Sequence, residues 1–194
     1  MEDCKEKEIS KYLEKALKSL RENFIHQNEI QKTAKRIARV WIEMSKGVNQ
    51  KPPELKWFKS NLKGFLIKGP LISYFLCPHH LLPVDSHIII GIVPNGYVLG
   101  LSKIGRIVNW ACNRFDLQEN ITKLIADTLW NVSKVYRPKG VIVGIIAEHS
   151  CEKVRGVRQK SPTQTIDIRG EIKDKELLLF NDSLDKLKKN YLQL

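Results

Sequence analysis

Two short clusters hold the histidine and cysteine side chains best suited to chemistry. They read Cys77-Pro78-His79-His80 and His149-Ser150-Cys151. Thiolates and imidazoles are the preferred ligands of zinc, and three protein ligands plus an open position make a catalytic site. The spacing is unlike that of a zinc finger, whose paired ligands recur in two short sets. Buried structural cysteines beside incidental histidines are the alternative interpretation. Spacing alone does not decide whether His79 or His80 faces a metal.

Basic side chains form a second set of candidates. Ser102, Lys103 and Arg106 stand at the start of a predicted helix, where free backbone N–H groups and the helix dipole favour an anion. Two further pairs are Arg155 and Arg158, just beyond Cys151, and Arg36 and Arg39, three residues apart on one face of a predicted helix. Any one of these groups is more often part of a solvated surface than of a binding site.

Gln118 and Glu119 begin the next predicted helix. An acid in the first turn ordinarily complements the helix dipole. A buried carboxylate could instead accept two hydrogen bonds, from N1 and the exocyclic amine of guanine. The residues alone leave both interpretations open.

Hydrophobic periodicity predicts the elements that must position these groups. Apolar residues recur at near-helical spacing through the first third of the chain, at Ile9, Leu13, Leu17, Leu20, Phe24, Ile30, Ile37, Trp41 and Met44. From about Leu62 the segments GFLIKGPLISYFL and VDSHIIIGIV are typical of strands. Two helices follow, the first with Ser102 as its expected N-cap. We then expect a buried strand over VIVGIIAEHSC, a further strand between Lys153 and Arg169, and a closing helix.

Length and charge limit the class of protein. The 194 residues suffice for one domain with a core, and the 33 Lys and Arg exceed the 21 Asp and Glu by 12. This excess favours nucleic acid, phosphorylated metabolites or an acidic membrane surface, or is simply a solvated basic surface. No apolar run approaches the roughly 18 residues of a membrane span, and the charged start lacks a secretory signal. We therefore expect a cytoplasmic protein whose four cysteines are thiols or metal ligands.

Four blocks resemble the signature blocks of GTP cyclohydrolase I, in order and at matching intervals. They are CPHHLLP, VPNGYVLGLSKIGRIV, LQENITKLIADTLW and AEHSCEKVRGVRQ, and the likeness is closest from Cys77 to Thr165. The resemblance implies an α+β tunnelling fold: an antiparallel four-stranded sheet with two helices inserted between strands 2 and 3, plus N-terminal helices and a C-terminal helix. We expect residues 1–50 to form the N-terminal helical segment and residues 51–194 the catalytic domain.

The resemblance also implies a role for each candidate residue. The zinc ligands would be Cys77, His80 and Cys151, and the catalytic histidines would be His79 and His149. Glu119, with Gln118 beside it, would bind the guanine, and Ser102, Lys103, Arg106 and Arg155 would bind the ribose and triphosphate. Arg36, with Arg39 nearby, would reach in from a neighbouring subunit.

Three positions depart from the family pattern. Pro78 stands where the family usually has glutamate, and the stretch around Asp85 and Ser86 lacks the usual Phe-x-Gly. Ala34 replaces the proline expected two residues before Arg36. None of these departures removes a zinc ligand or a catalytic histidine.

The activity implied by the resemblance is zinc-dependent conversion of GTP and water to formate and 7,8-dihydroneopterin triphosphate. The enzyme would be a homodecamer with sites shared between subunits, and it would act without membrane or nucleic-acid partners. The alternatives are a tunnelling-fold relative acting on another purine or pterin, a zinc-stabilised nucleic-acid-binding protein suggested by the charge, and a non-catalytic relative.

Overall fold

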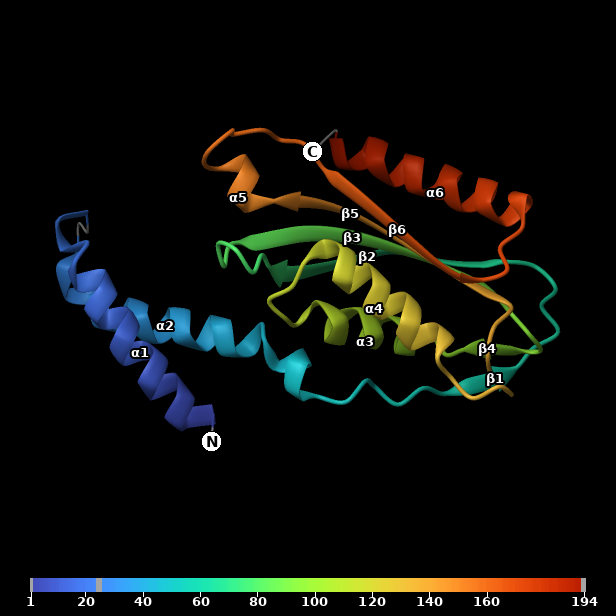
Figure 1. The fold of residues 1–194 in the computed structure, drawn as a ribbon, viewed down its shortest axis with the longest axis horizontal. Helices are drawn as coiled ribbons and strands as arrows, with labels where there is room; N and C mark the ends of the chain where they lie inside the picture. The colour runs from blue at the N-terminus through green and yellow to red at the C-terminus, as the bar shows by residue number, and fades with distance from the viewer. Residues whose placement is uncertain (1, 24–25, 193–194) are drawn as a thin grey trace.

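The structure is a computed structural model that describes residues 2–23 and 26–192 (Figure 1). The periodic residue Phe24 lies outside the described part. The elements in chain order are α1 (Glu2–Lys18), η1 (Arg21–Asn23), η2 (Gln27–Glu29), α2 (Ile30–Glu43), η3 (Lys46–Asn49), β1 (Trp57–Lys59), β2 (Leu66–Leu76), β3 (Pro83–Val93), β4 (Tyr97–Leu99), α3 (Leu101–Cys112), α4 (Gln118–Trp130), β5 (Gly140–His149), α5 (Ser150–Lys153), β6 (Thr163–Gly170) and α6 (Asp174–Leu192).

The main sheet has four antiparallel strands in the order β2-β3-β5-β6. Helices α3 and α4 lie between β3 and β5 in the chain, so they are inserted between the second and third strands. This arrangement confirms the α+β tunnelling fold expected from the sequence, with helices at both ends. A second sheet pairs only β1 with β4. These three-residue strands were not predicted, because such short segments carry no measurable periodicity.

Helices cover both faces of the sheet, as Figure 1 shows. Helices α3 and α4 pack on one face against fully buried residues such as Ile88, Val143 and Ile145. On the other face, Phe180 and Leu184 of α6 belong to a second core cluster with residues of β3 and β5. Successive strand residues point to opposite faces, so the continuous apolar run of β5 supplies both cores.

The N-terminal helices α1 and α2 pack against each other as a hairpin that extends beyond the end of the sheet (Figure 1). Ala34 and Ala38 of α2 are fully buried. An alanine at position 34 therefore suits a close helix contact. Gly47 joins this segment to the rest, because its N–H donates to the carbonyl of Asn113 at 2.8 Å. A side chain at Gly47 would collide with the backbone carbonyls of Trp110 and Asn113.

Two local expectations are corrected. Helix α3 begins at Leu101 and its N-cap is Gly100, so Ser102 is not the cap. The predicted strand between Lys153 and Arg169 starts only at Thr163. The segment before it contains the end of α5 and a loop, which the alternation of apolar and polar residues did not distinguish from a strand. Within the described part of the chain, no helix has the length and apolar character needed to cross a membrane.

Candidate metal centre and pocket

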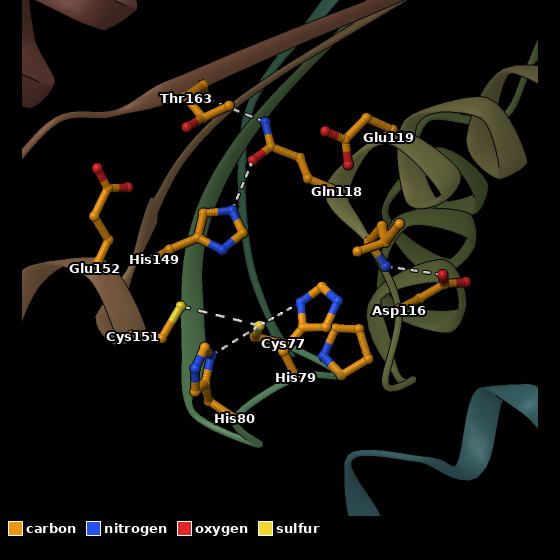
Figure 2. Close-up of a pocket in the computed structure, with 12 residues that line it drawn as sticks. Cys77, His79, His80, Asp116, Gln118, Glu119, His149, Cys151, Glu152 and Thr163 are labelled. Atoms are coloured by element: carbon orange, nitrogen blue, oxygen red, sulfur yellow. Dashed lines mark hydrogen bonds between the residues drawn. The ribbon is translucent and has the colours of Figure 1, made fainter. Parts of the chain in front are cut away.

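A pocket of about 290 Å³ lies where β2 and β5 end and α4 begins (Figure 2). The strand register brings these ends together, because Val84 of β3 pairs with Phe75 of β2 on one side and His149 of β5 on the other. A bridge between Leu76 and Phe115 ties the start of α4 to the same place. The lining residues are Cys77, Pro78, His79, His80, Asp116, Leu117, Gln118, Glu119, His149, Cys151, Glu152 and Thr163.

A tight turn after β2 presents the first cluster of ligands. Its backbone bonds run from Leu81 N–H to the Cys77 carbonyl at 2.8 Å and from Cys77 N–H to the Leu82 carbonyl at 3.0 Å. Pro78 follows Cys77 directly, in a turn position that suits the fixed φ of proline. Leu81 adopts a positive φ of 52° to close the turn. Proline in place of glutamate is thus compatible with a turn that holds Cys77 and His80.

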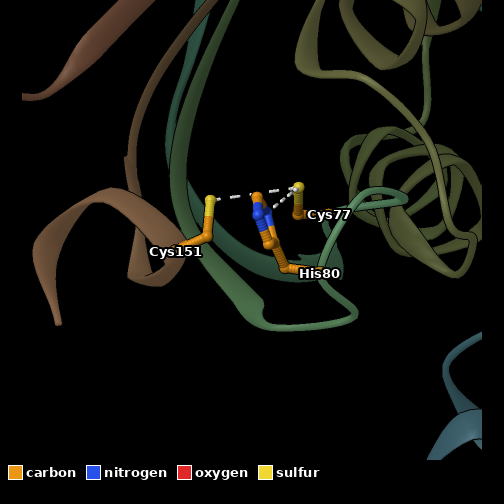
Figure 3. Close-up of side chains that lie close together, drawn as sticks. All are labelled: Cys77, His80 and Cys151. Carbon is orange, nitrogen blue, oxygen red and sulfur yellow. Dashed lines mark hydrogen bonds between the residues drawn. The ribbon is translucent and has the colours of Figure 1, made fainter. Parts of the chain in front are cut away.

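Cys77, His80 and Cys151 form a group whose ligand atoms all lie within 4.8 Å of one another (Figure 3). The two Sγ atoms are 4.0 Å apart, and Cys77 Sγ is 3.9 Å from His80 Nδ1. In a tetrahedral zinc site with Zn–S distances of about 2.3 Å, two sulfur ligands lie about 3.8 Å apart. A disulfide would need about 2.05 Å. The donor set and its spacing therefore fit a zinc ion with an open fourth position.

The four cysteines differ in their surroundings. Burial and the neighbouring thiol of Cys77 raise the pKa of Cys151, as expected for two sulfur atoms held together without a cation. Burial alone raises the pKa of Cys112 to about 11, and its side chain lies in the core. Cys4 is exposed on α1. Only Cys77 and Cys151 are placed to act as paired ligands among the described residues.

The two catalytic candidates lie on either side of this group. His79 Nδ1 is 3.8 Å from Cys77 Sγ, but His79 is not a member of the three-ligand group. His149 Nε2 lies 3.1 Å from Gln118 Oε1, and burial lowers the pKa of His149. A lowered pKa keeps the imidazole neutral near pH 7, so one ring nitrogen can accept a proton.

Glu119 lines the pocket as the second residue of α4 and is exposed to solvent. The buried carboxylate considered from the sequence is therefore not found in the isolated chain. Its neighbour Gln118 is only 1% exposed, and both the nitrogen and the oxygen of its side-chain amide already have partners within the protein. Glu119 and Gln118, which the sequence analysis treated as a pair, thus differ in the structure, because Glu119 is exposed to solvent and Gln118 is buried.

The basic residues of α3 lie away from this pocket. Ser102, Lys103 and Arg106 are in the first turns of α3, and none lines the pocket. The C-terminal end of α3 leads to the pocket. Because a helix of 12 residues is roughly 17 Å long at 1.5 Å per residue, the basic residues in its first turns lie near the other end of this length. In Figure 1 the start of α3 lies beside β4, at the opposite end of the sheet from α5.

The remaining arginines also lie outside the pocket lining. Arg36 and Arg39 are on α2, where their side chains are each 67% exposed and pair with Glu29 at 3.6 Å and Glu6 at 2.8 Å. Arg155 is exposed in the loop after α5. One chain therefore brings together the metal group, both histidines and Glu119, but not the cations expected to bind phosphate.

Four lining residues were missed in the sequence analysis: Asp116, Leu117, Glu152 and Thr163. Asp116 and Glu152 are next to clusters that had been singled out, so sequence proximity was the available signal. Asp116 Oδ1 accepts from Leu117 N–H and Asn120 Nδ2, both at 2.8 Å, and so orders the start of α4. Thr163 carried no signal, because only the β5–β6 pairing brings it to the pocket.

Similar proteins share most of this chain. A family model described as GTP cyclohydrolase I matches residues 9–180. A protein of Clostridium kluyveri named GTP cyclohydrolase 1 is 38% identical over 146 residues, covering 74% of this chain and 77% of its own. A protein of the same name from Streptococcus agalactiae is 36% identical over 173 residues, which cover 87% of this chain and 90% of that protein. A crystal structure of the archaeosine synthase QueF-Like in the apo form aligns at 15% identity with a TM-score of 0.42, over 63% of this chain and 100% of that one.

Proposed function

The chain belongs to the GTP cyclohydrolase I family, and from this premise we propose that it is a zinc-dependent enzyme converting GTP and water to formate and 7,8-dihydroneopterin triphosphate. The observation that carries the proposal is the meeting of Cys77, His80 and Cys151 in one pocket with two histidines and Glu119. The family suggests the reaction, and the zinc-ligand candidates, the two histidines and Glu119 in the pocket support this proposal.

The three-ligand group is proposed to hold the zinc ion. A zinc ion with an open position lowers the pKa of water toward neutrality and so makes a nucleophile available near pH 7. His80 would be the imidazole ligand, because one of its ring nitrogens lies with both sulfur atoms within 4.8 Å. His79, outside this group but 3.8 Å from Cys77 Sγ, would protonate N7 of the purine as C8 is attacked.

His149 is proposed to exchange protons with the ribose as it opens and rearranges. Its position across the pocket from His79 allows each histidine to act on a different part of the substrate (Figure 2). Glu119 would hold the guanine by accepting hydrogen bonds from N1 and the exocyclic amine. Because Glu119 is exposed in one chain, this interaction gains strength only when substrate or a neighbouring subunit excludes water.

We further propose that neighbouring subunits complete the site. A volume of about 290 Å³ lies at the lower end of the range for small-molecule sites, about 300–1,000 Å³, and suits the base and ribose better than a whole nucleotide. Lys103 and Arg106 do not line the pocket of their own chain, and we propose that they bind the triphosphate in the pocket of another chain. The same proposal covers Ser102, Arg36 and Arg39, which also lie outside the pocket lining, whereas Arg155 follows the lining residue Glu152 by only three positions.

Exposed apolar residues on the edge strands favour a homo-oligomer, and we expect the decamer implied by the family. Ile72 and Tyr74 of β2 are 57% and 52% exposed, and Ile166 and Ile168 of β6 are 42% and 41% exposed. Both strands form edges of the four-stranded sheet. Unpaired edges with apolar side chains are suited to pairing with another chain.

The proposal is tested by incubating zinc-loaded and chelator-treated protein with GTP. We expect the zinc-loaded protein, but not the chelator-treated protein, to release formate and a dihydropterin that fluoresces after oxidation, in equal amounts. Absence of both products in a zinc-loaded oligomer would contradict the proposal. Salt-sensitive affinity for nucleic acid without formate would favour the nucleic-acid-binding alternative.

A further inference from the structure

The side-chain amide of Gln118 has no hydrogen left for a substrate. Its Nε2 lies 3.3 Å from the Ile145 carbonyl, 3.1 Å from the Thr163 carbonyl and 3.1 Å from Thr165 Oγ1. An amide nitrogen carries two hydrogens, so these three acceptors already exceed its capacity. With only 1% of the residue exposed, Gln118 is closed off on its nitrogen side by β5 and β6.

The directions of the surrounding hydrogen bonds can be assigned. Thr122 Oγ1 donates its single hydrogen to the Gln118 carbonyl at 2.8 Å. The 2.7 Å contact between Thr122 and Thr165 must then be donated by Thr165, which leaves Thr165 Oγ1 free to accept from Gln118 Nε2. A flipped amide would place Gln118 Oε1 against two carbonyl oxygens, so the amide orientation is determined by its partners.

This orientation directs Gln118 Oε1 toward His149 Nε2, at 3.1 Å. An amide oxygen only accepts hydrogen bonds, so neutral His149 must carry its hydrogen on Nε2. Its Nδ1 is then the unprotonated nitrogen, and Figure 2 shows that side of the ring turned toward the part of the pocket that holds Cys77 and His79. One buried amide thus selects both the tautomer and the direction of the ring.

We infer that Gln118 is a positioning residue that fixes His149 as the Nε2–H tautomer and presents its bare Nδ1 to the substrate. The inference rests on the proposed function for the identity of that substrate, but the tautomer itself follows from the protein contacts alone. It replaces the purine-reading role expected for Gln118 from the sequence and leaves that role to Glu119. For histidines that bind a metal, removing the partner that orients them typically costs about 10- to 100-fold in activity, and we expect a loss of the same order here.

The direct test is ¹⁵N NMR of the full-length, zinc-loaded protein labelled at histidine. The His149 signals are assigned by their loss in His149→Gln. We expect a protonated Nε2 and a bare Nδ1 in the wild type without substrate. A hydrogen on Nδ1 would overturn the inference, and this result needs no variant of Gln118.

Kinetics of Gln118→Met and Gln118→Glu provide the second test. Methionine keeps the length but removes the acceptor, so kcat should fall about 10- to 100-fold while KM for GTP changes less than about threefold. In Gln118→Glu one oxygen remains for His149 Nε2, and burial favours a protonated carboxyl whose second oxygen can donate to one of the two facing carbonyls. This variant should therefore retain more kcat than Gln118→Met. The matched control is Gln31→Met, the same change at an exposed site on α2, which should behave as wild type.

The outcomes separate this inference from the proposed function. A rise in KM with kcat retained in Gln118→Met would show that Gln118 reads the substrate, and would overturn the positioning role. A wild type that releases no formate but shows the Nε2–H tautomer would contradict the proposed function alone. If Gln118→Met does not fold, the wild-type spectrum and Gln118→Glu still decide.

Discussion

At the scale of single residues, the site depends on three ligand atoms held within 4.8 Å of one another and on the histidines beside them. The contacts give His79 and His80 different places, although they are adjacent in the sequence. Of the two, only His80 forms a group with the sulfur atoms of both cysteines, whereas His79 lies 3.8 Å from Cys77 Sγ and is not part of that group. The two histidines should therefore respond differently to substitution.

Replacing Cys151 by alanine leaves a two-ligand group, which holds catalytic zinc poorly. We expect loss of bound zinc, measured by atomic emission on the purified protein, together with loss of turnover. In His79→Ala, zinc should remain while turnover falls by about 10²- to 10⁴-fold, the usual contribution of a general acid. Full zinc content and turnover in Cys151→Ala would reject the ligand assignment. Loss of zinc in His79→Ala would mean that His79, not His80, is the ligand.

Glu119→Gln tests guanine recognition. The substitution keeps the size of the side chain but removes its charge and one acceptor, at a cost of about 1.5–3 kcal/mol for a hydrogen bond to a charged group. We expect kcat/KM for GTP to fall accordingly, with zinc content unchanged. A variant that processes GTP like the wild type would show that Glu119 serves only the dipole of α4.

At the scale of elements, periodicity predicted the order of strands and helices along the chain, because the long strands and amphipathic helices have clear hydrophobic patterns. Their arrangement in one antiparallel sheet was implied by the resemblance. The resemblance, not periodicity, separated His79 from His80 and pointed to Glu119. The contacts by which we infer that Gln118 orients His149 were not predicted, because its partners Ile145 and Thr165 are remote in the sequence and meet only through the pairing of β5 with β6. The N-cap of α3 was also missed, because Gly100 has no side chain to signal it.

Arg169 links α4 to β6 through an ion-pair network. Its guanidinium donates to Asp127 Oδ1 at 2.7 Å and to both carboxylate oxygens of Asp167, and Lys123 also pairs with Asp127. The side chains of Arg169 and Asp127 are only 23% and 26% exposed. We expect Arg169→Gln to lower the free energy of unfolding by roughly 1–2 kcal/mol, between the values for exposed and buried pairs. Urea denaturation measures this loss.

The stabilising effect of Asp127 should depend on pH. Burial acts to raise the pKa of Asp127, but hydrogen bonds from Lys123 and Arg169 lower it overall. A carboxyl whose folded pKa is lowered stabilises the protein above its unfolded value of 3.8 and loses that effect as pH falls through the folded value. The difference between the wild type and Asp127→Asn should therefore be full near pH 7 and shrink below pH 3.8. A difference independent of pH would contradict this account.

At the scale of the whole molecule, one chain brings Cys77, His80 and Cys151 together with Glu119 in one pocket, but Arg36 lies on α2, outside the pocket lining. If sites are shared, Arg36→Ala and Glu119→Ala should complement each other when their subunits are unfolded and reassembled together. Some sites in the mixed oligomer would then receive both intact residues, and activity should partly return. No recovery in a correctly sized mixed oligomer would reject the shared-site proposal for Arg36 and leave the zinc chemistry unaffected.

The central claim is that this pocket removes C8 of GTP as formate. The most direct measurement is ¹³C NMR of zinc-loaded protein incubated with GTP labelled at C8. We predict that the label leaves the purine and appears in formate, in an amount equal to the unlabelled pterin formed, and that His149→Ala, which lacks the group proposed to act on the ribose, forms no pterin. A label that stays in the purine, in protein shown to hold stoichiometric zinc in the intact oligomer, would contradict the account.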